Sequence, residues 1–209
     1  MFAMAYPSKL TPERILQAAL PLLETDGPDA LNMRTLAARL GVQASSLYRH
    51  YPDRAALLTA IEEHTTLALH RAMILASERA AAPETRLTAA ALAHLSYATA
   101  HPHLYTLLLA PRPPAAATPG PGKDLWTLVL RLVGEVSGHP DDTPRTVALW
   151  AYLHGFALLT LSGQLGLSGD QGGFQIGLEA LIGGFGTSRN GAEMFVSVPA
   201  AGAGGSSPE

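Results

Sequence analysis

The stretch LGVQASSLYRHYPDRAALL, Leu40–Leu58, decides the fold of this chain. Apolar residues at helical spacing precede Gly41, and a glycine directly after such a segment ends a helix in the left-handed conformation. The Pro-Asp pair later in the stretch breaks the chain and caps a further helix. The pattern therefore predicts helices over Met33–Leu40, over a short Ala44–Tyr51 and over a long Asp53–Ala80. The first two form a helix-turn-helix, a motif that places its second helix in the major groove of DNA.

The short helix has two chemically different faces. Leu47 and Tyr51 are four residues apart and point toward a core, with Ala44 one turn above them. The opposite face carries Ser45, Ser46, Arg49 and His50. Small residues at the start of a helix let its backbone approach base edges, and an arginine binds either guanine or a phosphate. A glycine turn between two amphipathic helices also occurs in other helical proteins, so the spacing alone leaves DNA binding and plain helix packing both open.

The rest of the chain is predicted to be helical as well, which makes the fold class all-α. A helix from Thr11 to Asp26 opens with a good N-cap and a proline, and Pro21 inside it predicts a bend or a break. Pro111–Lys123 is rich in proline and glycine and is predicted to be a loop. The remaining helices are predicted over Glu84–Ala100, a short segment ending at Ala110, Leu125–Val136, Thr143–Leu165 and Asp170–Phe185.

The composition excludes several kinds of site. The chain has no cysteine, so a disulfide, a cysteine-ligated zinc ion and a thiol nucleophile are all excluded. His101 and His103 flank a proline, but no third ligand stands at a sensible spacing, and we expect no metal and no cofactor. No nucleophile is paired with a base in the sequence, so we expect no enzyme. The net charge is −3, yet residues 31–60 carry four arginines against one aspartate, which favours contacts with phosphates.

One segment raises the question of a membrane. Val147–Leu167 contains no Asp, Glu, Lys or Arg over 21 residues, about the length that spans a bilayer. His154, Gln164 and three glycines dilute the segment, and no cluster of basic residues flanks it. We favour a helix buried between protein surfaces, with a membrane-associated or adaptor protein as the alternative.

These motifs resemble those of the TetR family of bacterial transcriptional regulators, over Lys9 to about Ala60. The family's pattern is met by Leu36-Ala37, Leu40-Gly41-Val42, Leu47-Tyr48-Arg49-His50-Tyr51, Arg54 and Leu57-Leu58. The resemblance implies a helix-turn-helix DNA-binding domain over residues 9–56, with the motif at about 33–52. It also implies a larger helical effector-binding and dimerisation domain over residues 57–186, followed by a tail over 187–209 that we expect to be disordered. ALWAYLHGF, Ala148–Phe156, resembles the Trp-x-x-x-His-Gly (WHG) signature of one C-terminal subclass.

The resemblance also implies which residues bind DNA. Arg34 and Thr35 would reach DNA from the second helix, while Tyr48, His50 and Arg54 would contact phosphates. The start of the recognition helix would lie against base edges through Gln43, Ala44, Ser45 and Ser46, whereas Arg49 occupies a variable position of the family pattern. Two departures from the family pattern matter, Gln43 where a better cap is common and Pro21 inside the first helix. Arg54 stands where the family usually has lysine.

The partners implied by the resemblance are a double-stranded DNA operator, a second copy of the chain and a small-molecule effector of unknown identity. We expect a cytoplasmic homodimer that pairs through its last two long helices and reads a two-fold site, more often as a repressor than as an activator. The long helix Asp53–Ala80, which joins the two domains, is the expected lever. The candidate pocket residues are the histidines and aromatics of the larger domain, although ordinary core packing is an equal alternative for each one: His94, Tyr97, His101, Tyr105, Trp126, Trp150, His154 and Phe156.

Overall fold

The computed structural model describes residues 10–110, 121–167 and 169–187, and every regular element within these ranges is helical. The N-terminal helices are α1 (Pro12–Asp26), the 3-10 turn η1 (Pro28–Ala30), α2 (Met33–Leu40) and α3 (Ala44–Leu47). They are followed by α4 (Arg54–Ser77), α5 (Pro83–Ala100), α6 (Pro102–Leu108), α7 (Pro121–Ser137), α8 (Thr143–Leu161) and α9 (Gly173–Thr187). The predicted all-α fold class is confirmed.

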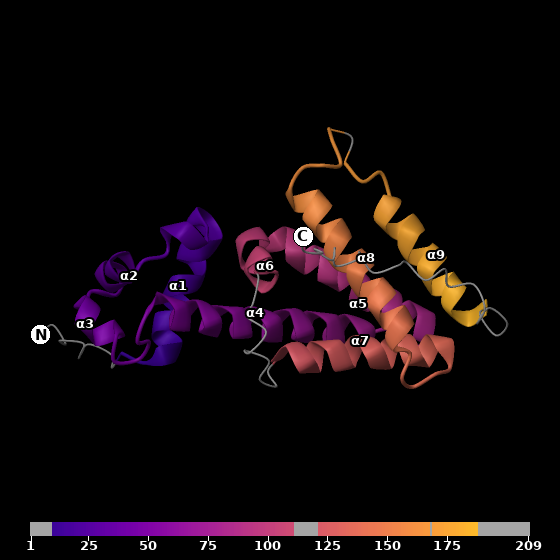
Figure 1. Ribbon diagram of the computed structural model, residues 1–209, viewed down its shortest axis with the longest axis horizontal. Helices are drawn as coiled ribbons and strands as arrows, with labels where there is room; N and C mark the ends of the chain where they lie inside the picture. Colours follow the sequence, from indigo (N-terminus) through magenta and orange to yellow (C-terminus); the bar gives the residue numbers. More distant parts are fainter. Residues whose placement is uncertain (1–9, 111–120, 168, 188–209) are drawn as a thin grey trace, which may run out of the picture.

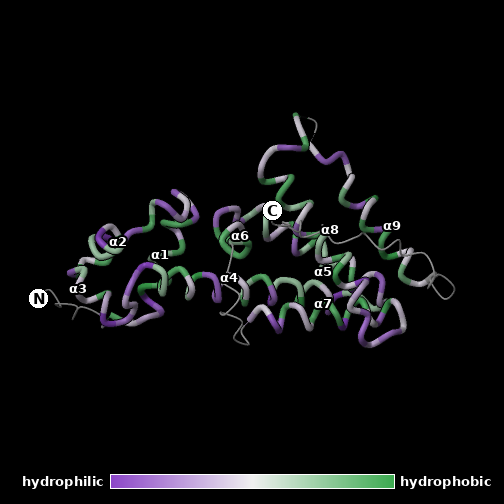
Figure 2. The backbone as a smooth tube through the Cα atoms, in the orientation of Figure 1, coloured by the Kyte–Doolittle hydropathy of each residue, from purple (hydrophilic) through white to green (hydrophobic). Residues whose placement is uncertain are grey.

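The helices form two groups that share one long helix. In Figure 1, α1, α2 and α3 gather at one end, α5 and α7–α9 gather at the other, and α4 runs from the first group into the second. Figure 2 shows hydrophobic segments within both groups. Each group has its own core of buried apolar side chains, and Leu104 of α6 belongs to the N-terminal core although it lies far along the chain.

Local capping explains where the N-terminal helices begin. The side chains of Thr11, Asn32 and Asp53 each accept a hydrogen bond from a backbone N–H in the first turn of α1, α2 and α4, respectively. Gly41 ends α2 in the left-handed region, with φ of 66°, as its position after the apolar stripe predicted. Gln43 precedes α3 without a side-chain cap, in agreement with its description as the weaker capping residue.

Several boundaries differ from those that the sequence predicts. The sequence predicts a bend or a break at Pro21, and the break is absent, because α1 continues through this exposed residue to Asp26. The recognition helix is shorter than predicted, since α3 ends at Leu47 and residues 48–50 form turns. Near the C-terminus, α8 ends at Leu161 rather than Leu165, and Gly163 adopts a positive φ just beyond it. The predicted tail over 187–209 begins at Thr187, which ends α9, and its residues 188–209 lie outside the described residues, as do residues 111–120 of the predicted loop.

The charge-free segment Val147–Leu167 divides its surface between the core and the exterior. Leu149, Leu153 and Ala157 are buried against the other helices, whereas Val147 and Leu158 are exposed. Within the described ranges, no helix is both long enough and apolar enough to cross a membrane.

Candidate functional sites

The first candidate site is the exposed surface of the helix-turn-helix. Leu47 is completely buried and anchors α3, while the hydroxyl of Tyr51 donates a hydrogen bond of 3.2 Å to the carbonyl of Pro12 in α1. Tyr48 is half exposed on the other side of the turn. The exposed members of this surface, which we call the α3 face, are Arg34, Thr35, Gln43, Ser45, Tyr48 and Arg49, with Ala44, Ser46 and His50 partly exposed. Most of the predicted DNA-contacting residues are therefore accessible together.

The charges of the α3 face leave it basic. Among the described residues, Arg34 and Arg49 form no ion pair or side-chain hydrogen bond. An acidic neighbour is Glu13, whose pKa is lowered by hydrogen bonds from its own backbone and from Thr11, and further by the nearby His50. The guanidinium groups of Arg34 and Arg49 thus remain available to contact phosphates or bases, and small side chains lie between them on the α3 face.

Arg54 is held by the protein itself. Its Nε donates a hydrogen bond of 2.7 Å to the carbonyl of Leu31, and its Nη2 donates to the carbonyl of Pro28. These carbonyls belong to η1 and the segment before α2, so the guanidinium joins the start of α4 to the helix-turn-helix. Arg54 stands where the family usually has lysine. The planar guanidinium donates to both carbonyls at once, whereas the compact ammonium group of a lysine does not reproduce this geometry.

A buried polar cluster occupies the second group of helices. The Tyr105 hydroxyl of α6 lies 2.6 Å from Nδ1 of His154 in α8 and 3.3 Å from Nε2 of His94 in α5. Burial lowers the pKa of His94 to about 3 and that of His154 to about 4, and it raises the pKa of Tyr105 well above its usual range. All three side chains are therefore uncharged near neutral pH.

Aromatic rings and a cavity lie next to this cluster. The Trp150 ring packs 4.5 Å from the His154 ring and 5.9 Å from Trp126, as measured between ring centroids. A cavity of about 330 Å³ opens beside Trp150 and His154. Its other described lining residues come from α4, the end of α6 and the start of α7: Thr66, Leu108, Leu109, Ala110, Gly122 and Leu125. The lining is mostly apolar with few polar groups, as in small-molecule sites.

The short helix α6 connects the cluster to the DNA-binding end. His103 Nδ1 lies 2.9 Å from the carbonyl of Glu24 and 3.2 Å from that of Leu23, in the last turn of α1. Leu104 is buried in the N-terminal core, whereas Tyr105 is buried in the C-terminal core. Neighbouring residues of one helix thus belong to both halves of the molecule, and a shift of α6 necessarily changes contacts in each.

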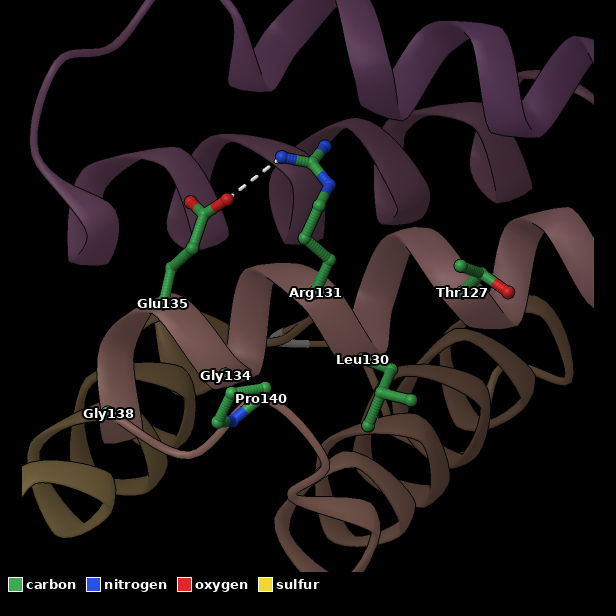
Figure 3. Close-up of a pocket in the computed structure, with 7 residues that line it drawn as sticks. All are labelled: Thr127, Leu130, Arg131, Gly134, Glu135, Gly138 and Pro140. Atoms are coloured by element: carbon green, nitrogen blue, oxygen red, sulfur yellow. Dashed lines mark hydrogen bonds and ion pairs between the residues drawn. The ribbon is translucent and has the colours of Figure 1, made fainter.

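A separate hollow lies on the outside of α7. Figure 3 shows its lining, where Arg131 and Glu135 form an ion pair of 2.8 Å and Pro140 lies over Gly134. Glu135 also pairs with Arg86 of α5 at 2.8 Å, so these charges tie two helices together. The hollow measures about 390 Å³ and runs along α7 from Thr127 to Gly138, but it shares no described lining residue with the cavity beside Trp150, and its Arg131 and Glu135 already bind each other. We assign it no role in ligand binding.

The outer face of α8 is apolar although it is exposed, while the exposed residues of α9 include both Ile176 and the hydrogen-bonded pair Gln175 and Glu179. Val147, Leu158 and Leu159 of α8 and Ile176 of α9 are each at least 41% exposed. Gly155 lies on the same face of α8, and a Cβ added there would meet no atom within 4 Å. On the inner side, the Tyr152 hydroxyl donates a hydrogen bond of 2.7 Å to the carbonyl of Phe174, which joins α8 to α9. This pair of helices therefore has one packed face and one open face, which is apolar along α8 and at Ile176 of α9.

Comparison with known proteins identifies the family. The model described as bacterial regulatory proteins, tetR family, matches residues 15–61, and the model described as tetracyclin repressor-like, C-terminal domain, matches residues 87–181. An uncharacterized HTH-type transcriptional regulator of Mycobacterium tuberculosis is 30% identical over 176 residues, which cover 77% of this chain and 75% of that protein. The chain belongs to the TetR family of transcriptional regulators.

Other relatives of this TetR-family regulator match it over different lengths. The class A tetracycline repressor of Escherichia coli is 48% identical over 56 residues, which cover 27% of this chain and only 26% of that protein. A crystal structure of TetR from Acinetobacter baumannii in complex with minocycline superimposes with a TM-score of 0.67 at 26% identity, covering 87% of this chain and 99% of that one. The similarity of fold thus extends over nearly the whole chain.

The TetR-family structure brings together only part of the predicted pocket. His94, Tyr105, Trp126, Trp150 and His154 form one connected cluster. The other three candidates lie apart from it. Tyr97 and His101 pack on each other at 4.7 Å, and burial raises the pKa of Tyr97 to about 12 near Glu24 of α1. Phe156 lies between α8 and α9, with its ring 5.0 Å from that of Phe174.

The sequence does not predict the positions that Thr66 and His103 occupy in the folded regulator. Thr66 lines the cavity from α4, and its hydroxyl donates a hydrogen bond of 2.9 Å to the carbonyl of Glu62. The sequence suggests His103 only as a candidate metal ligand, whereas in the structure its ring contacts a carbonyl at the end of α1. No group of three or more potential metal ligands occurs in the part of the chain that the structure describes. Helical periodicity gives no signal for either position, since both contacts depend on how distant helices pack.

Proposed function

We propose that this TetR-family regulator is a ligand-controlled repressor that binds a two-fold DNA operator as a homodimer. The main support is a pair of hydrogen bonds made by α6. His103 bonds to a carbonyl in the last turn of α1, and Tyr105 bonds to His154 in the effector domain. A ligand beside Trp150 and His154 acts on the same helix that supports the DNA-binding domain. The Acinetobacter baumannii TetR solved with minocycline supports a small-molecule effector.

The α3 face supplies the DNA contacts in this proposal. Its small residues, Ala44, Ser45 and Ser46, allow the start of α3 to approach base edges. Arg34 and Tyr48 flank them and contact phosphates, and Arg49 contacts a base or a phosphate. Arg54 serves in positioning rather than in phosphate binding, because its guanidinium already binds the carbonyls of Leu31 and Pro28.

The second copy of the chain covers the open face of α8 and α9. The exposed residues of this face are apolar or small along α8 from Val147 to Leu159, and Gly155 has no packing reason within its own chain to be a glycine. A two-fold pairing of these helices buries Ile176 and Leu158, and it places two α3 faces on one side for a symmetric operator.

Ligand binding and DNA binding are then coupled, because the ligand has different affinities for two arrangements of α6. A ligand that binds better when α6 is displaced lowers the population of the DNA-binding arrangement, by no more than its preference for that state. Both α6 and α4 transmit the change, because α4 belongs to both groups of helices.

The test is selection of operators from random double-stranded DNA with the full chain. We expect enrichment of a two-fold sequence that is bound by a dimer. Absence of any enriched two-fold sequence, both without ligand and with a ligand that binds the cavity, would contradict the proposal.

A further inference from the structure

Ser45 and Arg49 lie on the side of α3 that points away from the N-terminal core. Leu47 is completely buried, and at about 100° per residue the positions two before and two after it lie on the opposite side of the helix. The N–H of Tyr51 donates a hydrogen bond of 3.0 Å to the carbonyl of Leu47, so the helical winding continues through the turn that contains Arg49. Ser45 and Arg49 are accordingly exposed, whereas Ser46 is partly covered.

The residues expected to contact phosphates lie on the two flanks of this outermost side. Tyr48 is one residue after Leu47 and His50 is three residues after it, which places their side chains on opposite flanks. Tyr48 is half exposed, and His50 lies near the carboxylate of Glu13 in α1. When a helix lies in the major groove, its flanks face the sugar-phosphate walls and its outermost side faces the base edges. Arg49 is therefore placed to meet bases rather than phosphates.

The guanidinium group of Arg49 is available for this contact. It forms no ion pair or side-chain hydrogen bond within the described part of the chain, and residues 1–9, which lie outside that part, contain no Asp or Glu. Ser45, one turn earlier on the same side, has a short side chain that leaves space beside Arg49. In Figure 1, α3 lies at the end of the molecule opposite α8 and α9, so the effector domain does not cover it.

An arginine that faces base edges distinguishes guanine from the other bases. Guanine presents two acceptors, N7 and O6, on its major-groove edge, and a guanidinium donates to both at once. Adenine presents an acceptor and a donor at the corresponding positions, so one N–H of the guanidinium would face an amino group. A serine hydroxyl both donates and accepts, and it therefore discriminates less between bases.

We propose that Arg49 determines operator specificity by binding N7 and O6 of one guanine in each half-site. This inference rests on the proposed function and names the base that the α3 face selects. Arg34 and Tyr48 then contribute affinity that is independent of sequence, whereas Arg49 contributes the preference at one base pair.

The experiment starts from the operator that the full chain enriches from random double-stranded DNA. Fluorescence anisotropy compares its affinity with those of operators in which each base pair of the half-site is replaced in turn. We expect one guanine whose replacement weakens binding about tenfold or more per half-site. Arg49→Ala should abolish this preference and leave those at the other positions unchanged.

Two further variants separate base recognition from charge and from folding. In Arg49→Gln, the amide both donates and accepts as adenine requires, so the preference at the same base pair should change from guanine to adenine. Arg34→Ala should instead weaken binding to all of these operators by the same factor. Circular dichroism checks that the exposed substitutions leave the helix content unchanged.

Two outcomes would overturn the inference. One is an equal loss of affinity for every operator in Arg49→Ala with a reduced salt dependence, which indicates a phosphate contact. The other is an unchanged base preference in both Arg49 variants. Either outcome leaves the proposed function intact, because an operator has been selected, whereas failure to enrich any operator would contradict both.

Discussion

His103 and Tyr105 are two residues apart on α6 and bond to opposite halves of the molecule. The His103 ring contacts the carbonyls that end α1, while the Tyr105 hydroxyl contacts two histidines of the effector domain. A helix as short as α6, Pro102–Leu108, has little length over which to absorb a displacement. A change at Tyr105 is therefore carried to the last turn of α1, next to the DNA-binding motif.

The first prediction concerns this connection. His103→Leu removes the contact with Leu23 and Glu24 while keeping an apolar body against Gly27. We expect the variant to bind a cavity ligand and operator DNA separately, but the ligand should change operator affinity at least about fivefold less than it does in the unaltered chain, within the usual range of coupling energies. Gel-shift titrations with and without the cavity ligand measure this, with His139→Leu as the control. An unchanged ligand effect would contradict a role for His103 in coupling.

Operator binding should depend on Arg34 through its charge. If Arg34 neutralises one phosphate in each subunit, Arg34→Ala should weaken binding to all sequences and reduce the salt dependence of log K by about two per dimer. Arg79→Ala is a matched control, since Arg79 is also exposed but follows the far end of α4. Fluorescence anisotropy over a series of salt concentrations gives the slopes, and equal slopes for the two variants would contradict a phosphate contact by Arg34.

Replacing Arg54 should mainly lower the stability of the DNA-binding domain. Arg54→Ala leaves the carbonyls of Leu31 and Pro28 without their donors, and loss of hydrogen bonds to a charged group typically costs about 2 kcal/mol or more. We expect faster hydrogen exchange in residues 28–36 and a lower melting temperature. Arg54→Lys keeps the charge but not the fork, so it should resemble Arg54→Ala. Normal exchange together with weaker DNA binding would instead indicate a direct phosphate contact.

The stability of the effector domain should fall in mild acid. Burial holds the pKa of His94 near 3 and that of His154 near 4, whereas both titrate near 6.5 in the unfolded chain. Between these values the unfolded chain binds more protons, so the stability that is fully present above pH 6.5 is lost as the pH falls toward 4. For His154, the difference between 6.5 and about 4 corresponds to roughly 3 kcal/mol of unfolding free energy.

Urea denaturation followed by tryptophan fluorescence at several pH values measures this loss. His154→Phe should show a shallower dependence of unfolding free energy on pH, because one of the two buried histidines is gone. His139→Phe should retain the full slope. A slope in His154→Phe as steep as in the unaltered chain would mean that His154 is already protonated in the folded state.

Two glycines distinguish dimerisation from packing within one chain. A Cβ at Gly155 meets open space, whereas a Cβ at Gly177 would collide with the Tyr152 hydroxyl that binds α9. Gly155→Leu should therefore raise the dimer dissociation constant at least about tenfold with little change in helix content. Gly177→Ala should lower stability by about 1–3 kcal/mol, as overpacking does. Light scattering and thermal melts separate the two effects, and a fully dimeric Gly155→Leu would exclude this face from the interface.

The sequence by itself determined the helical class and most helix ends of the DNA-binding half. Thr11, Asn32, Asp53 and Gly41 act on backbone groups only a few residues away, so their effects can be read from spacing alone. The same reasoning failed at Pro21, where the rest of α1 outweighs the cost of one missing bond on an exposed surface.

Only the tertiary structure decided which distant residues meet. Arg54 donates hydrogen bonds to carbonyls more than twenty residues earlier in the chain. His94, Tyr105 and His154 come from three different helices and form one cluster. Tyr97 and Phe156 lie outside this cluster. Helical periodicity specifies the side of its own helix on which a residue lies, but not which other helix will pack there. That choice depends on the packing of all the helices at once, so the contacts of α6 with both halves appear only in the folded molecule.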